Sequence, residues 1–153
     1  GDDYYEAILK AMLSVGYRVP KKNVLISSGP MRSKAELLNS AKMLVEHGFR
    51  IYATKGTRHF LANNGIKTKL LYWPDEHKQP NTYTYIKEKK IDLIINIPKD
   101  FSKAELDNDY IVRRAAVDFN IPLITNARLA SAFIYAFTRY KPEALKIKSW
   151  AEY

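Results

Sequence analysis

The segment Ala53-Thr54-Lys55-Gly56-Thr57 combines residue types that can bind an anion. Its two threonine hydroxyls can converge on one oxyanion, and Gly56 lets the main chain come close to it. The segment follows an apolar run and opens a short helical pattern, so the free N–H groups of a helix N-terminus would face the same ligand. Phosphate and carboxylate groups suit such a site. The alternative is that Thr57 only caps the helix.

Other candidate ligand residues stand at or near the ends of predicted strands. Lys34, in the first turn of a predicted helix, could add a cation to the anion site, or could be a solvated lysine. Trp73 could offer its ring to a planar or apolar part of a ligand, or could lie in the core. Asn96 could hydrogen-bond a ligand or form a turn. Ser28 directly follows the first predicted strand.

Catalytic machinery is not evident in the sequence. The carboxylates of Asp107, Asp109 and Asp118 are candidates for acid–base work, but no nucleophile, base and orienting group can be assembled around them. The chain has neither the GxxxxGK[ST] nor the GxGxxG phosphate-binding motif. The sequence therefore predicts a binding domain that is itself non-catalytic.

Composition excludes several classes of protein. The 153 residues are 46% hydrophobic, which is enough for one globular core. The absence of cysteine excludes disulfide scaffolds and thiolate sites, and the three histidines lack metal-ligand spacing, so no metal site is expected. No apolar run is long enough to span a membrane. The acidic start, which lacks Met, predicts a segment of a longer chain without a signal peptide, and we expect a cytoplasmic location.

The net charge of +9 is compatible with two kinds of partner. One is nucleic acid, and the other is a small anion or an acidic protein surface. The basic residues are spread along the chain and form no dense run, which favours a mostly solvated basic surface. We therefore expect no nucleic-acid partner, and keep a basic nucleic-acid-binding domain as an alternative.

Apolar periodicity predicts an alternation of strands and helices. Strands are expected at 23–27, 49–53, 69–72, 91–97 and 122–125, and helices at 5–15, from 33 to the stop at Gly48, 57–63, 81–89, 109–119 and 129–140. Ser33 followed by Glu36 matches a capping box. The run 91–97 is apolar on both faces, as in a central parallel strand. The pattern predicts a three-layer α/β/α, Rossmann-like fold with a five-stranded parallel sheet, and ligands at the carboxyl ends of its strands.

Several segments resemble one family, that of the last domain of the carbamoyl-phosphate synthase large subunit. Residues 48–57, GFRIYATKGT, match its GF-x-[LI]-xAT-x-GT segment. Similar stretches are EAILKAMLS at 6–14, IDLIIN at 91–96, DYIVRRAAVD at 109–118 and IPLITN at 121–126. The resemblance implies a methylglyoxal-synthase-like fold. It also implies three parts: a leading helix and linker from the preceding synthase domain at 1–20, the effector-binding domain at 21–140, and a C-terminal tail at 141–153.

The family resemblance implies that this domain regulates ATP-dependent carbamoyl phosphate synthesis for pyrimidine and arginine pathways. The effector would be an anionic nucleotide such as UMP or IMP, or N-acetylglutamate. By position, the effector-binding residues are Ser28, Lys34, Thr54, Gly56, Thr57, Trp73, Asn96, Lys99 and Asp109. Thr125 stands where some bacterial members contact ornithine across a domain boundary.

Three positions depart from the nucleotide-binding and N-acetylglutamate types. Many nucleotide-binding members have Lys where this chain has Trp73, and the N-acetylglutamate type has Asn at the positions of Lys99 and Asp109.

The partners that the resemblance implies are the synthase domains of the same chain and a glutaminase small subunit. ATP, magnesium or manganese, and potassium are implied for the parent protein, and no cofactor for this domain. A stand-alone lyase of the methylglyoxal-synthase type is an alternative, although its catalytic segments are not matched.

Overall fold

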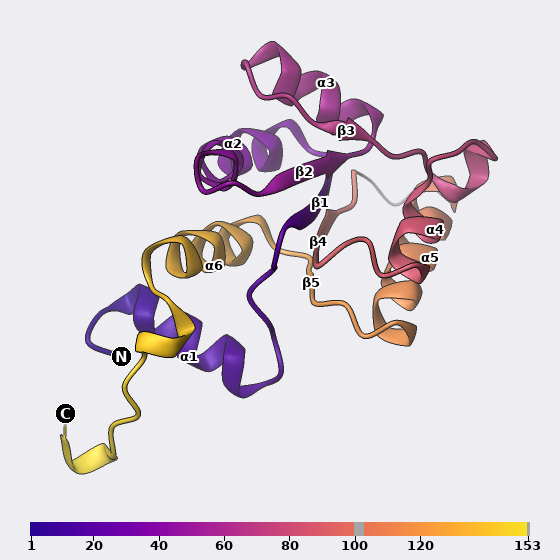
Figure 1. The fold of residues 1–153 in the computed structure, drawn as a ribbon. Helices are drawn as coiled ribbons and strands as arrows, with labels where there is room; N and C mark the ends of the chain where they lie inside the picture. The colour runs from indigo at the N-terminus through magenta and orange to yellow at the C-terminus, as the bar shows by residue number, and fades with distance from the viewer. Residues whose placement is uncertain (100–102, 153) are drawn as a thin grey trace.

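The computed structural model describes residues 1–99 and 103–152. Its elements alternate between helix and strand (Figure 1), with these bounds: α1 Tyr4–Ser14, β1 Asn23–Ser28, α2 Met31–Glu46, β2 Arg50–Ala53, α3 Lys55–Asn63, β3 Lys69–Leu70, η1 Pro74–Glu76, α4 Thr82–Lys87, β4 Leu93–Ile97, α5 Lys103–Asp118, β5 Leu123–Ile124, α6 Ala127–Arg139, η2 Pro142–Ala144 and η3 Trp150–Glu152. Within the described part of the chain, no helix has both the length and the hydropathy needed to cross a bilayer.

All five strands are parallel and form one sheet in the order β3-β2-β1-β4-β5. Central β1 pairs with β2 and β4, with Val24 opposite Ile51 on one side and opposite Leu93 on the other. The chain runs outward from β1 to β3 and then returns to β4 beside β1. This topological switch point places the carboxyl ends of β1 and β4 where ligands bind in open α/β sheets.

Helices cover both faces of the sheet, because alternate residues of each strand point to opposite sides. Val24 and Ile26 pack in a large core with α1, α2, α3 and α6. Leu25 and Ile94 pack in a second core with α4 and α5. The apolar character of both sides of β1 and β4 fits a sheet buried on both faces. The predicted three-layer α/β/α fold with a five-stranded parallel sheet is confirmed (Figure 1).

Four helices begin two or more residues before their predicted starts. α3 and α6 each begin two residues early, at Lys55 and Ala127, and α2 and α5 are the other two. α2 begins at Met31 and has Pro30 in the N-cap position, because the fixed φ of proline (−66° here) suits a helix entry. Ser33 is therefore inside the first turn rather than a cap, and no capping box forms. α5 begins at Lys103, six residues before the predicted start at Asp109. Its first two turns are rich in polar side chains and carry little apolar periodicity.

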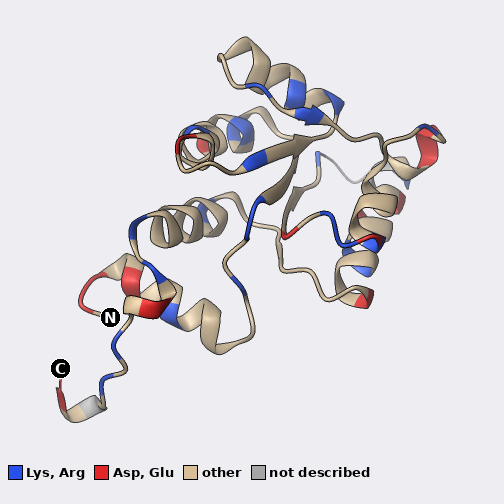
Figure 2. Ribbon diagram, in the orientation of Figure 1, with Lys and Arg blue, Asp and Glu red and all other residues tan. Residues whose placement is uncertain are grey.

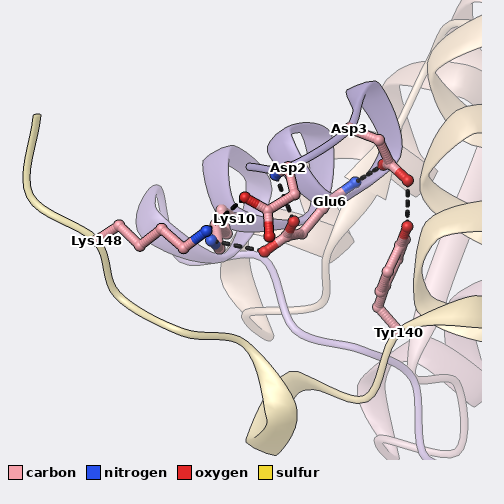
Figure 3. A network of polar contacts seen from close by, with 6 residues as sticks. All are labelled: Asp2, Asp3, Glu6, Lys10, Tyr140 and Lys148. Carbon is pink, nitrogen blue, oxygen red and sulfur yellow. Dashed lines mark hydrogen bonds and ion pairs between the residues drawn. The ribbon is translucent and has the colours of Figure 1, made fainter. Parts of the chain in front are cut away.

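A polar network ties the start of the chain to its C-terminal part (Figure 3). Asp3 accepts hydrogen bonds from the Glu6 N–H (2.9 Å) and from the Tyr140 hydroxyl. Asp2 pairs with Lys148 at 2.5 Å. These contacts hold the pKa of Asp3 below its ordinary value, chiefly through the Glu6 N–H, and that of Asp2 through Lys148. The segment expected at 1–20 thus contacts Tyr140 of the domain expected at 21–140, and the tail expected at 141–153 contacts the 1–20 segment through Lys148.

Candidate functional site

The N-terminus of α3 follows directly on the carboxyl end of β2. Thr54 has the extended conformation of an N-cap residue, but its side chain makes no capping hydrogen bond. The first main-chain bond of the helix runs from Arg58 N to Thr54 O at 2.8 Å. The N–H groups of the three residues between them therefore have no acceptor within the helix and lie at its positive dipole end. The alternative role of Thr57 as the helix cap is wrong.

Lys34 brings a cation to this helix start. A Cβ atom added at Gly56 would lie 3.6 Å from Lys34 Nζ, so the ammonium group of α2 lies against the first turn of α3. Lys34 and Gly56, which are far apart in sequence, are therefore brought together as the anion hypothesis requires. Main-chain N–H groups and a nearby ammonium can together bind a phosphate or carboxylate.

The two threonine hydroxyls are directed at β1. Thr57 Oγ1 accepts a hydrogen bond from Ser28 N (2.9 Å) and donates one to Ser28 O (3.2 Å). β2 ends at Ala53, so it has no residue left to pair with Ser28 at the end of β1. The Thr57 hydroxyl takes the place of that missing strand partner. Since it donates to Ser28 O, this hydroxyl cannot also donate to an oxyanion in this arrangement. Thr57 fixes α3 to the sheet.

Thr54 belongs to a buried row of polar side chains across the carboxyl ends of three strands. Its Oγ1 lies 3.0 Å from Ser27 Oγ. Ser27 is opposite Asn96 in the β1–β4 register, and Asn96 Nδ2 donates to Asp109 Oδ1 of α5 at 2.9 Å. Asp109 is 0% exposed and Asn96 1% exposed. The row extends from the carboxyl end of β2 to α5, on the sheet face covered by α4 and α5.

Two buried acceptors beside this row have no hydrogen-bond partner among the described residues. They are Asn96 Oδ1 and Ser28 Oγ. Buried polar atoms are nearly always paired, and an unpaired one destabilises a fold by about 1–3 kcal/mol. Both atoms lie at the switch point, where a ligand group able to donate hydrogen bonds could pair with them.

Trp73 and Lys99 lie near the same end of the sheet. Trp73 packs against the core under α4 and α5, on the same face as the polar row, and its main-chain N–H donates to Glu76 at 2.7 Å. Lys99 is exposed on the loop after β4. A Cβ atom at Gly29 would lie 2.2 Å from Lys99 Cα, so the lack of a side chain at Gly29 is what allows these two loops to meet.

Thr125 occupies a different place. It is exposed and lines a hollow of about 360 Å³ between the starts of α2 and α6, together with Arg32 and Glu36. Glu36 pairs there with Arg128 at 3.5 Å. The predicted site residues thus divide into one group at the switch point and a separate Thr125. Within the ranges the structure describes, no three His, Asp or Glu side chains are grouped so that they could hold a metal ion.

Sequence reasoning missed two residues of this site. Ser27 was recognised only as a strand end, although its hydroxyl connects Thr54 to the register position of Asn96. Gly29 lies outside every predicted strand and helix. The alternation of side chains along β1 is the signal for Ser27, because it places residue 27 on the opposite face from Ser28.

The sequence matches the model of a known family. Residues 36–125 match the family model of the MGS-like domain, which is more than half of the chain. The chain belongs to the MGS-like domain family. The resemblance found in the short sequence segments is thereby confirmed.

Curated relatives are much larger proteins. The MGS-like chain is 36% identical over 150 residues to the multifunctional protein CAD of Squalus acanthias, covering 89% of this chain and 7% of that protein. It is 37% identical over 148 residues to the multifunctional protein URA2 of Saccharomyces cerevisiae, covering 91% and 7%. Against the mitochondrial carbamoyl-phosphate synthase [ammonia] of Homo sapiens it is 36% identical over 141 residues, covering 89% and 9%. The chain therefore spans less than a tenth of these relatives.

A solved structure shares the fold at lower identity. The methylglyoxal synthase of Elizabethkingia anophelis superposes with a TM-score of 0.53 and 19% identity, over 75% of this chain and 77% of that one. At this identity the comparison supports the fold and carries no statement about activity.

Proposed function

We propose that this MGS-like domain is the effector-binding regulatory domain of a carbamoyl-phosphate synthase, and that it binds an anionic small molecule at the N-terminus of α3. The observation that carries the proposal is the juxtaposition of Lys34 Nζ with the uncapped first turn of α3. Positive charge from the helix dipole and from the ammonium would act on the same anion. The similarity to synthase-containing relatives supports the regulatory role.

The buried row suggests how binding could be transmitted. Two hydrogen-bonded side-chain pairs, Thr54–Ser27 and Asn96–Asp109, lie between an anion held near Thr54 and helix α5. Ser27 and Asn96 are opposite each other in the β1–β4 register. An effector regulates only by binding one conformation better than another, so α5 would need two positions relative to β4. ATP, its metal ions and the glutaminase small subunit would act on other parts of the parent protein.

The effector would carry hydrogen-bond donors as well as negative charge. Asn96 Oδ1 and the Asp109 carboxylate accept hydrogen bonds, so a hydroxyl or amide N–H of the ligand would suit that side of the site. Trp73 would contact its planar or apolar part. UMP, IMP and N-acetylglutamate all have these features, and they are the first compounds to test.

Isothermal titration calorimetry of the chain with UMP, UTP, IMP and N-acetylglutamate tests the proposal. Lys34→Met should weaken binding of the preferred compound at least about tenfold, because a charge-assisted hydrogen bond is lost. Lys42→Met, on the same helix but exposed, is the matched control and should bind as the parent chain does. Absence of binding to all four compounds at millimolar concentration, or equal loss in both variants, would contradict the proposal. Phosphate release from dihydroxyacetone phosphate would instead indicate a lyase.

A further inference from the structure

The opposite edge of the sheet carries a concentration of positive charge. Two hollows of about 360 and 340 Å³ lie at the amino ends of the strands, one beside β1, β4 and β5 and the other beside β1, β2 and β3. The neighbouring residues Lys21 and Lys22 line one hollow each, so the two adjoin. We define the amino-end basic face by six lining residues, which are Arg18, Lys21, Lys22, Arg50, Lys67 and Lys69.

The positive charge of this face is not neutralised within the described chain. The ion pairs among the described residues involve other cations, namely Lys10, Lys90, Arg114, Arg128 and Lys148. Asp92, whose Oδ2 accepts the N–H groups of Lys22 and Asn23 at 2.8 Å each, adds one negative charge to the lining of the first hollow, and the positive charges of the face outnumber it. Figure 2 shows basic segments at the amino ends of β1 and β2.

Folding alone gives no reason to gather these cations. Lys22 directly precedes Asn23, which is opposite Arg50 in the β1–β2 register, and Lys69 is opposite Tyr52, two residues along β2 from Arg50. Neighbouring strands lie about 4.8 Å apart, and like charges on them repel one another. A cluster maintained against this repulsion indicates an anionic partner.

Apolar side chains accompany the cations and define the partner further. Val45 is 47% exposed and lines the second hollow with Phe49. Phe119 and Ile121, both partly exposed, line the first hollow. A phosphate or other small anion would leave this apolar surface uncovered. A polypeptide segment that combines carboxylates with apolar side chains would use both components.

We propose that the amino-end basic face docks an acidic polypeptide segment that carries apolar side chains. Since relatives contain more than ten times as much chain as this domain, such a segment could belong to the same protein. The proposal does not depend on the effector, because the face lies at the opposite ends of the strands from Thr54 and Asn96. The amino-end basic face would then be the surface by which the domain contacts the rest of a large assembly.

Fluorescence anisotropy with a labelled peptide of Glu and Leu tests the docking. The triple variant Lys22→Glu, Arg50→Glu and Lys69→Glu should weaken binding about tenfold or more, because three exposed ion pairs are reversed. Higher salt should weaken binding by the parent chain, because exposed charges are screened. Replacing Leu by Ser in the peptide should also weaken it.

A matched variant controls for net charge. Lys42→Glu, Lys87→Glu and Lys141→Glu reverse the same number of exposed basic side chains, and these line neither hollow. This control should bind the peptide as the parent chain does, and circular dichroism should show that both variants are folded. Equal weakening in both variants would overturn the proposal. So would tighter binding of an RNA oligomer or of phosphatidylserine vesicles than of the peptide at the same ionic strength.

Discussion

Replacing Thr57 by Val should test the contact that fixes α3 to the sheet. Valine has nearly the same shape as threonine but no hydroxyl, so Ser28 N and Ser28 O would lose the partner they have at 2.9 and 3.2 Å. Thr57 and Ser28 are each only 3% exposed, so water cannot easily replace the hydroxyl. The variant therefore leaves two buried main-chain groups unpaired.

The expected loss of stability follows from this count. An unpaired buried polar group destabilises a protein by about 1–3 kcal/mol, so two such groups with partial relaxation should lower the free energy of unfolding by about 3 kcal/mol. For a chain of this size, each kcal/mol lowers the melting temperature by roughly 2–4 °C. The variant should melt about 6–12 °C below the parent chain.

Urea unfolding followed by circular dichroism measures this loss. The midpoint should fall while the slope with urea stays the same, because the surface exposed on unfolding is unchanged. Thr138→Val is the matched control, because the Thr138 hydroxyl donates to the carbonyls of Ile134 and Tyr135 inside α6, which also have helical partners. A loss below about 1 kcal/mol, or one equal to that of the control, would refute the role given to Thr57.

Three further predictions concern stability. Gly29→Ala should lower it by about 1–3 kcal/mol, because the new methyl group would lie 2.2 Å from Lys99 Cα; an unchanged melting temperature would contradict the close approach. Ser28→Ala should be neutral or slightly stabilising, since it removes a buried hydroxyl without a partner among the described residues; a loss above about 1 kcal/mol in urea unfolding would show that the hydroxyl is paired. Asp3→Asn should lower stability near neutral pH, and the deficit should shrink as the pH falls through and below the ordinary value of 3.8. The carboxylate has a lowered pKa in the folded state, so its contribution is present above the unfolded pKa and lost as it is protonated; a pH-independent deficit would exclude this linkage.

Much of the fold is predictable from local pattern. The apolar runs at β1 and β4 identify central parallel strands, because strands buried on both faces lack alternation. The start of α5 was not predictable in the same way. Its first turns are polar, and the residue taken as its start, Asp109, is buried within the helix because it hydrogen-bonds Asn96 of β4. That pairing joins residues that no local pattern relates.

The sequence predicts which residues gather at the candidate site better than it predicts where their side chains point. Strand ends and the loop pattern place Thr54, Thr57 and Asn96 at one edge of the sheet, as the structure does. The orientation of the hydroxyls was not predictable, since it depends on where β2 stops pairing with β1. Thr57 therefore hydrogen-bonds Ser28, and under the proposed function the anion would be held by main-chain N–H groups and Lys34.

The network that joins Asp2 to Lys148 and Asp3 to Tyr140 also bears on how the domain could be inserted into another protein or circularly permuted. Because segments near the two ends lie beside each other (Figure 3), a host protein could accept the whole unit within a surface loop without stretching its own backbone. For the same reason, a circular permutant with the ends joined by a short linker and a new opening in an exposed turn should still fold.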